Sequence, residues 1–460
     1  HIHGFGGADA QDAEVEGIMG TMSEGLLSAG VTSFLPSPLT DDHEGLKAVC
    51  TVVGEHYQEA RGAKVRGIFF EGPFFTEEKK GAQNPKYMRD AKMWELEDWQ
   101  EAAHGMLKKI GLAPERDGSE DFIRKATESG VVIALGHSNA TYKQAVAGVQ
   151  AGASVWVHTF NGMSGMTHQE PGMVGAILNT PNTYAELICD GHHVRPEAAE
   201  IVMKMKGADH VVLITDSMRA AGLPDGPYML GEYEVEVRDG AAWLPTGRPA
   251  ASILTLKTAV KNVIDWGIAT PAEAIMMASL TPAKSVNIDD VCGQIKPGLS
   301  ADFIVLDNDF DLVGKGENFL KFKFSSNEKT LKKYPFEFDF FLVYTITDKG
   351  LEIKYEVLNK TKGDMYFSLG AHPAFALELN DEIKLEDYYL EFEKDETAQI
   401  YQLRSDALIL EEKKDYLKNE KIIKLSGTIF DNDAIIFENL NSSKVTLKCS
   451  KSTRELSMDY

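Results

Sequence analysis

Cysteine is scarce in this chain of 460 residues, which contains only four: Cys50, Cys189, Cys292 and Cys449. They lie far apart and form no CxxC pair, which argues against a disulfide scaffold and against a cysteine-based zinc site. Free thiols are typical of a reducing compartment, so we expect a cytoplasmic protein.

Long hydrophobic runs are missing, and positive charge is in short supply. No apolar stretch approaches the roughly 18 residues that a membrane-spanning helix needs, and the N-terminus has no signal-peptide pattern. The chain carries 47 Lys and Arg against 70 Asp and Glu, a formal net charge of -23. Such a surface repels nucleic acid and anionic membranes, so we expect neither as a partner. Because the chain begins at His1 without an initiator Met, we interpret it as processed, trimmed or a fragment.

Residues 1–313 alternate short apolar runs with amphipathic stretches. Runs such as VTSFLPS (31–37), VVIALGHS (131–138) and HVVLITDS (210–217) are typical of buried strands that end in polar residues. The stretches 14–30 and 119–130 have helical patterns. Strand–helix alternation repeated this often predicts a parallel sheet and favours a (β/α)8 TIM-type barrel, whose chemistry takes place at the C-terminal ends of the strands.

Residues 314–460 have a different composition, rich in Lys, Glu, Phe, Asn and Ile. Apolar and polar residues alternate with period two over 336–361 and 387–406, which predicts antiparallel strands with two unlike faces. We therefore expect two domains, an α/β barrel over 1–313 and an all-β sandwich over 314–460.

Six potential metal ligands fall at the expected strand ends of the first domain. His1 and His3 can reach one point, because residues i and i+2 of a strand face the same side. Taken alone, this pair is weak evidence for a metal site, and a tag remnant or an exposed pair is the more common explanation. The other four end separate strands: Glu71, His137, His158 and Asp216. Because barrel strands end at a common mouth, we predict that all six meet there and hold metal.

Imidazole and carboxylate ligands without thiolate suit Zn²⁺, Fe²⁺, Mn²⁺ or Co²⁺ and do not discriminate among them. We expect one or two such ions in each chain. A bound ion makes water more acidic and polarises a carbonyl, which favours hydrolysis of an amide or a related bond. An Asp beside the ion can take the proton of the attacking water and deliver it to the leaving nitrogen.

The first domain resembles the N-acetylglucosamine-6-phosphate deacetylase family of the amidohydrolase superfamily. The motifs that carry the resemblance include HIHGFGGAD, EGPFFTEEKKGAQNP, LGHSNATY, HTFNGMSGMTHQEPGMVGAIL, DGHHVRP and LITDSMRAAG. The resemblance implies a (β/α)8 barrel with a small β-sandwich beside it, usually in a homodimer. It also implies removal of the acetyl group from N-acetylglucosamine 6-phosphate, a small-molecule partner, to give glucosamine 6-phosphate and acetate.

The resemblance implies a role for each matching residue. The main metal would be held by Glu71, His137 and His158, and a second one by His1 and His3. Asp216 would act as general base and then as general acid. Substrate would meet four further residues: Ala82, Asn161, Gly162 and, at the phosphate end, His193.

Two positions depart from the family pattern. Gln83 stands where many relatives have a His that polarises the acetyl carbonyl, and a second metal on His1 and His3 could replace that His. Gln169 stands where relatives have an Arg that grips the phosphate. Possible substitutes are Arg195, Lys79 and Lys80.

Residues 318–460 resemble the aldose 1-epimerase (galactose mutarotase-like) family. The motifs are KYPFEFDFFLVYTI, YEVLNKT, FSLGAHPAFAL and DAIIFENL. His372 would be the general acid that protonates the ring oxygen, although a structural His before Pro is an equal alternative. The family's second His and its late Glu base find no counterpart in this chain, so we expect no epimerase activity.

Both domains look clipped relative to these families. The bulk of the first barrel strand should precede His1, so we expect a barrel that is clipped at its N-terminal end. We interpret the chain as two truncated sugar enzymes joined near Val313. The alternatives to a working deacetylase are a carbohydrate-binding or epimerase-type protein, or an inactive chimera.

Overall fold

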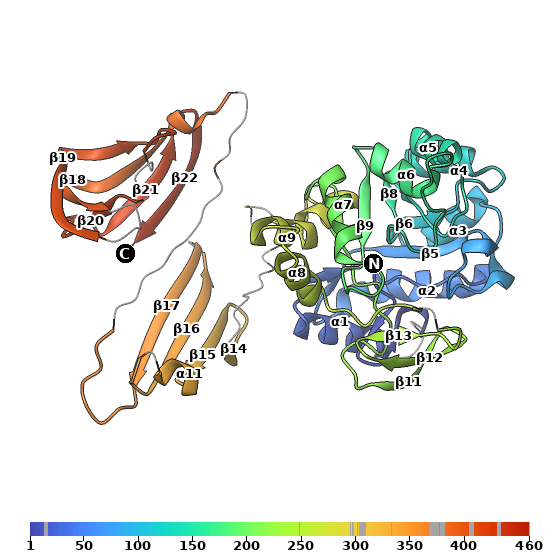
Figure 1. The fold of residues 1–460 in the computed structure, drawn as a ribbon, viewed down its shortest axis with the longest axis horizontal. Helices are drawn as coiled ribbons and strands as arrows, with labels where there is room; N and C mark the ends of the chain where they lie inside the picture. Colours follow the sequence, from blue (N-terminus) through green and yellow to red (C-terminus); the bar gives the residue numbers. More distant parts are fainter. Residues whose placement is uncertain are drawn as a thin grey trace. The chain divides into compact units, whose positions relative to one another are not determined.

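The computed structural model describes residues 1–12, 17–247, 249–294, 296, 299–300, 302, 310–332, 334–348, 350–367, 377, 382–403, 409–429 and 434–459. The chain separates into two compact units, residues 1–308 and 309–460 (Figure 1). Among the described residues, no helix combines the length and the apolar character needed to cross a membrane.

The centre of the first unit is a parallel sheet of six strands in sequential order. These are β5 (Ile68–Phe74), β6 (Leu107–Leu112), β7 (Val132–Leu135), β8 (Val155–Trp156), β9 (Tyr184–Leu187) and β10 (Val211–Leu213). All seven residues of β5 are buried. Burial on both faces explains why these strands read as continuous apolar runs in the sequence.

Two further segments close this sheet into a ring of eight. Beside β5, the backbone N–H of Phe69 donates to the carbonyl of Pro36 at 3.1 Å. Pro36 in turn forms a parallel bridge with Ile2, and the N–H of Asp216, beyond β10, donates to the carbonyl of His1 at 3.2 Å. The prediction of a TIM-type barrel is confirmed, and the short segment at His1 completes its ring.

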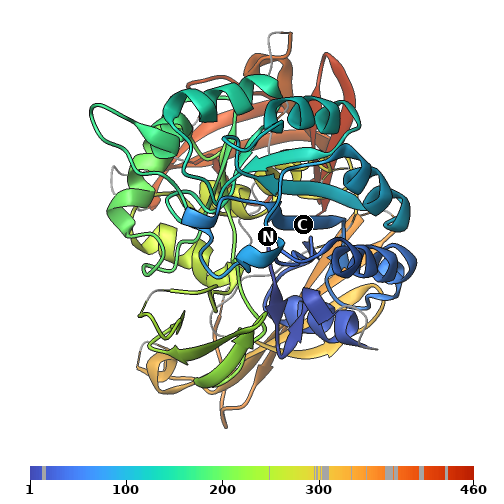
Figure 2. The ribbon, with the colours of Figure 1, turned by 90° about the vertical axis from the view of Figure 1, so that its right-hand side faces the viewer.

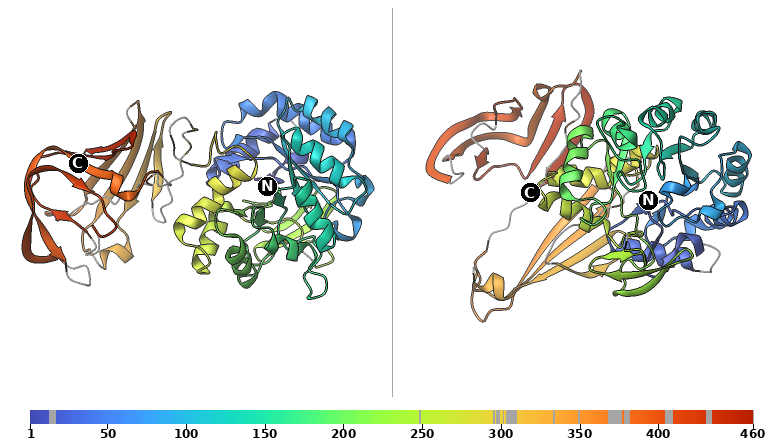
Figure 3. Two further views of the ribbon diagram at one scale, coloured as in Figure 1. Left: turned by 90° about the horizontal axis from the view of Figure 1, so that it is seen from above. Right: turned by 45° about the vertical axis from the view of Figure 1, so that its right-hand side comes forward.

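Helices alternate with the strands and surround them (Figure 3, left), and the N-terminus lies at the centre of the ring. They are α1 (Ile18–Ser28), α2 (His43–His56), α3 (Met93–Ala102), α4 (Ser119–Glu128), α5 (Tyr142–Ala151), α6 (Gly172–Asn179), α7 (Pro196–Lys206), α8 (Leu256–Asp265), α9 (Pro271–Ala278) and α10 (Leu280–Ser285). Two of them begin with a full capping box, formed by Thr141 with Gln144 and by Thr270 with Glu273. The predicted helices over 14–30 and 119–130 correspond to α1 and α4.

Small elements border the barrel. Two short parallel strands are β3 (Ser33–Phe34) and β4 (Lys64–Val65), and a short hairpin consists of β1 (Gly4–Phe5) and β2 (Ala8–Asp9). An antiparallel sheet of β11 (Gly226–Leu230), β12 (Tyr233–Arg238) and β13 (Ala241–Trp243) lies on one side of the barrel (Figure 2). One-turn 3-10 helices are η1 (Ala10–Asp12), η2 (Tyr57–Glu59), η3 (Glu77–Lys79) and η4 (Pro85–Tyr87).

The second unit is built almost entirely of antiparallel strands. One sheet contains β14 (Asp311–Lys315), β15 (Phe319–Ser325), β16 (Phe338–Thr347) and β17 (Gly350–Asn359). The other contains β18 (Tyr388–Leu403), β19 (Ile409–Lys424), β20 (Ile436–Phe437), β21 (Lys444–Cys449) and β22 (Ser452–Asp459). The short helices are α11 (Glu328–Leu331) and η5 (Leu385–Asp387). The all-β prediction is confirmed, while His372 lies outside the described residues.

Candidate metal centre

The barrel mouth brings together all six predicted ligands. Glu71 lies in β5, and His137, His158 and Asp216 follow β7, β8 and β10. They form two groups in which the potential ligand atoms lie within 4.8 Å of one another. The groups are Glu71 with His137 and His158, and Glu71 with His1, His3 and Asp216.

The first group centres on Oε1 of Glu71. This oxygen lies 3.1 Å from Nε2 of His137 and 2.8 Å from Nε2 of His158, and the two nitrogens are 3.1 Å apart. Nδ1 of His137 donates to the carbonyl of Lys79 at 2.7 Å, and Nδ1 of His158 donates to that of Asn161 at 3.1 Å. Because a carbonyl only accepts, each Nδ1 carries a proton. In the neutral ring Nε2 then carries a lone pair.

The second group uses the other oxygen of the same carboxylate. Nε2 of His3 lies 3.1 Å from Oε2 of Glu71 and 2.9 Å from Oδ1 of Asp216. Its Nδ1 donates to the carbonyl of Ser37 at 2.6 Å. The carboxylate of Glu71 is therefore shared by the two groups.

His1 completes the second group. Its Nδ1 lies 3.0 Å from Oε2 of Glu186, and its Nε2 lies 3.2 Å from Oδ1 of Asp216. The side chain of His1 is fully buried. Neither Nε2 of His1 nor Oδ1 of Asp216 has a hydrogen-bond partner of acceptable geometry, although both atoms are buried.

These observations fit a divalent cation in each group. Four imidazoles turn their Nε2 atoms toward two buried carboxylates, and lone pairs that face carboxylates repel unless a proton or a cation lies between them. Burial of a polar atom without a hydrogen-bond partner costs free energy, and a cation would supply the missing partner. Nitrogen and carboxylate donors without thiolate are the ligands that zinc and the neighbouring divalent metals accept.

The pKa values reflect the same crowding of opposite charges. Burial by itself raises the pKa of Glu71, but hydrogen bonds with His137 and His158 outweigh burial and hold this pKa well below its usual range. Burial lowers the pKa of His1, yet Asp216 and Glu186 outweigh it and raise this pKa to about 9. The low pKa keeps the carboxylate of Glu71 ionised, so it can bind a cation.

Three site residues have a left-handed backbone that is uncommon outside glycine. The φ angles are 43° at His137, 29° at His158 and 48° at Asp216. Each such residue stores of order 1–3 kcal/mol of strain, and such residues cluster at functional sites. The sharp turn at each strand end directs the side chain into the barrel mouth instead of along the sheet.

Two charged residues of the site were not predicted from the sequence. Glu186 in β9 contacts His1, as described above, and its Oε1 accepts a hydrogen bond from Nζ of Lys109 in β6. Both are buried, at 1% and 3% exposure. The signal for them is a charged residue inside an apolar run, since Glu186 interrupts TYAELICDG and Lys109 precedes IGLA.

Asn161 and Gly162 lie directly behind the first group. The carbonyl of Asn161 accepts from His158, and a Cβ on Gly162 would lie 2.9 Å from Nδ1 of His137. Gly162 also has a φ of 60°. The carbonyl of Asn161 thus fixes the orientation of the His158 ring, and the absence of a side chain on Gly162 leaves room for the His137 ring.

Gln83 contacts Glu71 in this structure. Its Nε2 donates to Oε2 of Glu71 at 2.6 Å, and its Oε1 accepts from the backbone N–H of Thr40 at 2.7 Å. The neighbouring Ala82 is half-buried.

His193 forms a pair with Asp190. Its Nδ1 lies 2.6 Å from Oδ2 of Asp190, and its Nε2 lies 3.3 Å from the carbonyl of Ala250. Burial lowers the pKa of His193, but Asp190 outweighs it and the pKa is raised. The paired imidazole is therefore biased toward its cationic form, which suits an anion.

The cationic candidates for a phosphate differ in exposure. Arg195 has a side chain that is 76% exposed, with Nε 3.9 Å from Glu197. Nζ of Lys80 lies 3.4 Å from the hydroxyl of Tyr233. Gln169 is exposed.

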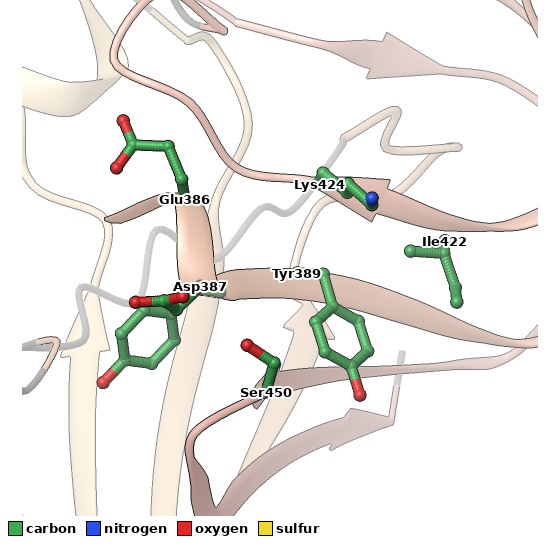
Figure 4. A pocket seen from close by; sticks show the side chains of 7 residues that line it. Glu386, Asp387, Tyr389, Ile422, Lys424 and Ser450 are labelled. Carbon is green, nitrogen blue, oxygen red and sulfur yellow. The ribbon is translucent and has the colours of Figure 1, made fainter. Parts of the chain in front are cut away.

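A pocket of the second unit involves none of the predicted site residues (Figure 4). It has a volume of about 220 Å³ and is lined by Glu386, Asp387, Tyr388, Tyr389, Ile422, Lys424 and Ser450. Asp387 at its edge pairs with Lys451 at 3.0 Å.

Comparison with known proteins agrees with this geometry. The model of the Amidohydrolase family matches residues 1–333. The chain belongs to the amidohydrolase family. Residues 303–458 match a second model, described as Aldose 1-epimerase. Both resemblances predicted from the sequence are confirmed.

Among relatives in the amidohydrolase family, two are 39% identical to this chain. One is the N-acetylglucosamine-6-phosphate deacetylase of Vibrio furnissii, matched over 313 residues, 68% of this chain and 78% of the relative. The other is the N-acetylgalactosamine-6-phosphate deacetylase of Escherichia coli O157:H7, matched over 309 residues, 67% and 81% of the two chains.

Solved structures of the family include a similar barrel. The N-acetylglucosamine-6-phosphate deacetylase of Pasteurella multocida superposes with a TM-score of 0.62 at 31% identity, covering 65% of this chain and 78% of that one. The enzyme of Thermotoga maritima gives a TM-score of 0.61 at 33% identity, covering 66% and 80%.

Proposed function

We propose that this amidohydrolase removes the acetyl group from N-acetyl-D-glucosamine 6-phosphate, giving glucosamine 6-phosphate and acetate. The observation that carries the proposal is the buried carboxylate of Glu71, shared between two groups of imidazoles at the barrel mouth. The relatives at 39% identity are deacetylases of amino-sugar phosphates, which supports this class of substrate.

Glu71, His137 and His158 would hold the main divalent cation, and His1 and His3 a second one beside Asp216. Zn²⁺, Fe²⁺, Mn²⁺ and Co²⁺ all suit these donors. A cation bound there supplies Lewis acidity, which polarises the acetyl carbonyl and makes water a stronger acid.

Asp216 carries the proton in this proposal. One oxygen of its carboxylate takes one proton from the attacking water while the water oxygen forms a bond to the acetyl carbon. The same proton then passes to the amide nitrogen as the C–N bond breaks, and the second proton of the water is lost from the new carboxyl group to solvent, so acetate and an amine leave. A positioned general acid–base group contributes roughly 10²–10⁴-fold to such a rate.

Substrate recognition falls to the residues around the mouth. Asn161, Gly162 and Ala82 would line the pocket for the acetylated sugar. The anionic end of the substrate would meet His193, with Gln169 in place of an Arg. Arg195 and Lys80 are the cations that could complete a phosphate site.

The test is acetate release from N-acetylglucosamine 6-phosphate, with N-acetylglucosamine and N-acetylgalactosamine 6-phosphate in parallel, each with added divalent metal. We expect release from the first and little from the unphosphorylated sugar. Equal release from both would keep the deacetylation and exclude a phosphate requirement. Absence of release from all three would overturn the proposal.

The proposal extends to the domain organisation, the oligomeric state and the compartment of the protein. Residues 1–313 would form the deacetylase domain, and residues 314–460 a partial epimerase-like sandwich. We expect no epimerase activity from His372, and a homodimer for the barrel. All four cysteines are free and buried, which suits a cytoplasmic protein.

A further inference from the structure

A buried ion pair crosses the interior of the barrel beneath the second group of ligands. Lys109 lies in β6 and Glu186 in β9, and β7 and β8 separate these strands in the sheet. Their side chains therefore meet across the barrel interior, where Nζ of Lys109 donates to Oε1 of Glu186. Lys and Glu are almost never fully buried without a partner, because removing each charge from water is costly. The pair needs a reason for being there.

The pair leads directly to His1. Oε2 of Glu186 lies 3.0 Å from Nδ1 of His1, so one carboxylate connects the ammonium and the imidazole. The ring of Phe69 packs against both ends of this chain of contacts. Nζ of Lys109 lies 3.7 Å from the ring centroid, and the His1 ring meets it edge-on at 4.8 Å between centroids.

His1 differs from the other three histidines of the centre in what holds it. His3, His137 and His158 each donate Nδ1–H to a backbone carbonyl. His1 alone among these four relies on a side chain, Glu186. A carboxylate that accepts the Nδ1 proton fixes the tautomer and leaves the Nε2 lone pair for a metal.

We propose that Lys109 and Glu186 are a positioning pair that makes His1 a ligand of the second cation. Glu186 fixes the tautomer and the orientation of His1, and Lys109 holds Glu186 in place and balances its charge. This inference rests on the metal centre of the proposed function. It adds to that function the residues on which the second ion depends.

The test counts metal in the full-length protein. Chelator-treated protein is titrated with Co²⁺, while elemental analysis gives the bound equivalents and visible absorption reports the surroundings of each ion. The main variant is Lys109→Met with Glu186→Gln, which removes both charges at nearly constant volume and leaves no unpaired charge. Outer contacts of metal-bound histidines typically contribute 10–100-fold to affinity.

The control is another ion pair of the same unit, between a buried carboxylate and an arginine whose side chain is 28% exposed. Arg89 and Glu95 meet at 2.8 Å, and Glu95 is 2% exposed, much like Glu186. Arg89→Met with Glu95→Gln therefore removes a comparable pair that does not contact the ligands.

We expect two equivalents of Co²⁺ in the wild type and in the control variant. In the main variant the second equivalent of Co²⁺ should bind 10–100-fold more weakly and lose its visible absorption. The first equivalent should keep its wild-type affinity and its absorption. The proposal is overturned if the main variant binds the second equivalent with wild-type affinity, if the control loses it equally, or if the wild type binds one equivalent only. Acetate release is measured separately. The expected metal counts without acetate release would support the positioning pair and contradict the proposed function.

Discussion

The side-chain amide of Gln83 donates a hydrogen bond to Oε2 of Glu71 across 2.6 Å, and both residues are 2% exposed. Gln83 thus holds the carboxylate that both candidate ligand groups share.

Replacement of Gln83 tests this support. Gln83→Leu removes the donor to Glu71 and the acceptor of the Thr40 N–H. We expect metal affinity to fall by roughly 10–100-fold, because outer contacts orient the ligand carboxylate. Titration of chelator-treated protein measures it. Gln100→Leu is the control, since Gln100 donates to the carbonyl of Leu107 and not to a ligand. Wild-type affinity in Gln83→Leu would contradict the assignment.

The two ligand groups should be separable by mutation. His158→Ala removes a ligand of the first group and should lose the main metal, whereas His3→Ala should lose only the second. Glu71→Gln should weaken both, because both groups share this carboxylate. Elemental analysis after dialysis gives the equivalents for the three variants. Unchanged metal content in His158→Ala would refute its role as a ligand.

Much of this centre was predictable because strand ends in a barrel have a fixed location. A parallel barrel places every strand's C-terminal end at one mouth, so Glu71, His137, His158 and Asp216 could be grouped from the sequence before any distance was known. The two-residue spacing of His1 and His3 added the second group. The period-two pattern of 336–361 likewise predicted the paired strands β16 and β17.

The Lys109–Glu186 pair could not be predicted in the same way. The two residues are 77 positions apart, and their strands are not neighbours in the sheet, so no local pattern relates them. A lone Glu or Lys in an apolar run signals a buried charge but does not name its partner. The contact of Gln83 with Glu71 was also not predictable, since the sequence does not show which way a side-chain amide turns.

Replacement of Asp216 should lower the rate of acetate release without removing the metal of the first group. Asp216→Asn keeps the size of the side chain but removes the acceptor for the water proton, so we expect acetate release to fall by roughly 10²–10⁴-fold. The main metal should stay bound, because Glu71, His137 and His158 are unchanged. The second equivalent should weaken, since Oδ1 lies 2.9 Å from Nε2 of His3. Near-normal turnover would contradict the proton-transfer role.

His372 should not matter for deacetylation. It belongs to the segment that resembles the epimerase family, in the other compact unit of the chain. We expect His372→Ala to release acetate at the wild-type rate and to bind the same number of metal equivalents. A large loss of activity in this variant would show that the second unit takes part in the reaction.

Lys206, at the end of α7, should make the free energy of unfolding vary with pH in the alkaline range. Its side chain is buried, and within the described part of the chain its ammonium donates to two neutral partners, the carbonyl of Thr180 and, at 2.9 Å, the hydroxyl of Thr183. Burial disfavours the charged form and lowers the pKa of Lys206 from 10.5 to about 8.

The direction of the effect follows from proton counting. Between pH 8 and 10.5 the unfolded chain keeps this proton while the folded chain has lost it, so this group makes the protein more stable as pH rises. The slope cannot exceed about 1.4 kcal/mol per pH unit, the limit for one proton. Lys206→Met removes the titration, so the free energy of unfolding of wild type relative to variant should increase across this range. Denaturant unfolding at pH 7.5, 9 and 10 measures the difference, with Lys204→Met as control because Lys204 is 70% exposed. A constant difference across the three pH values would show that Lys206 keeps an ordinary pKa in the folded protein.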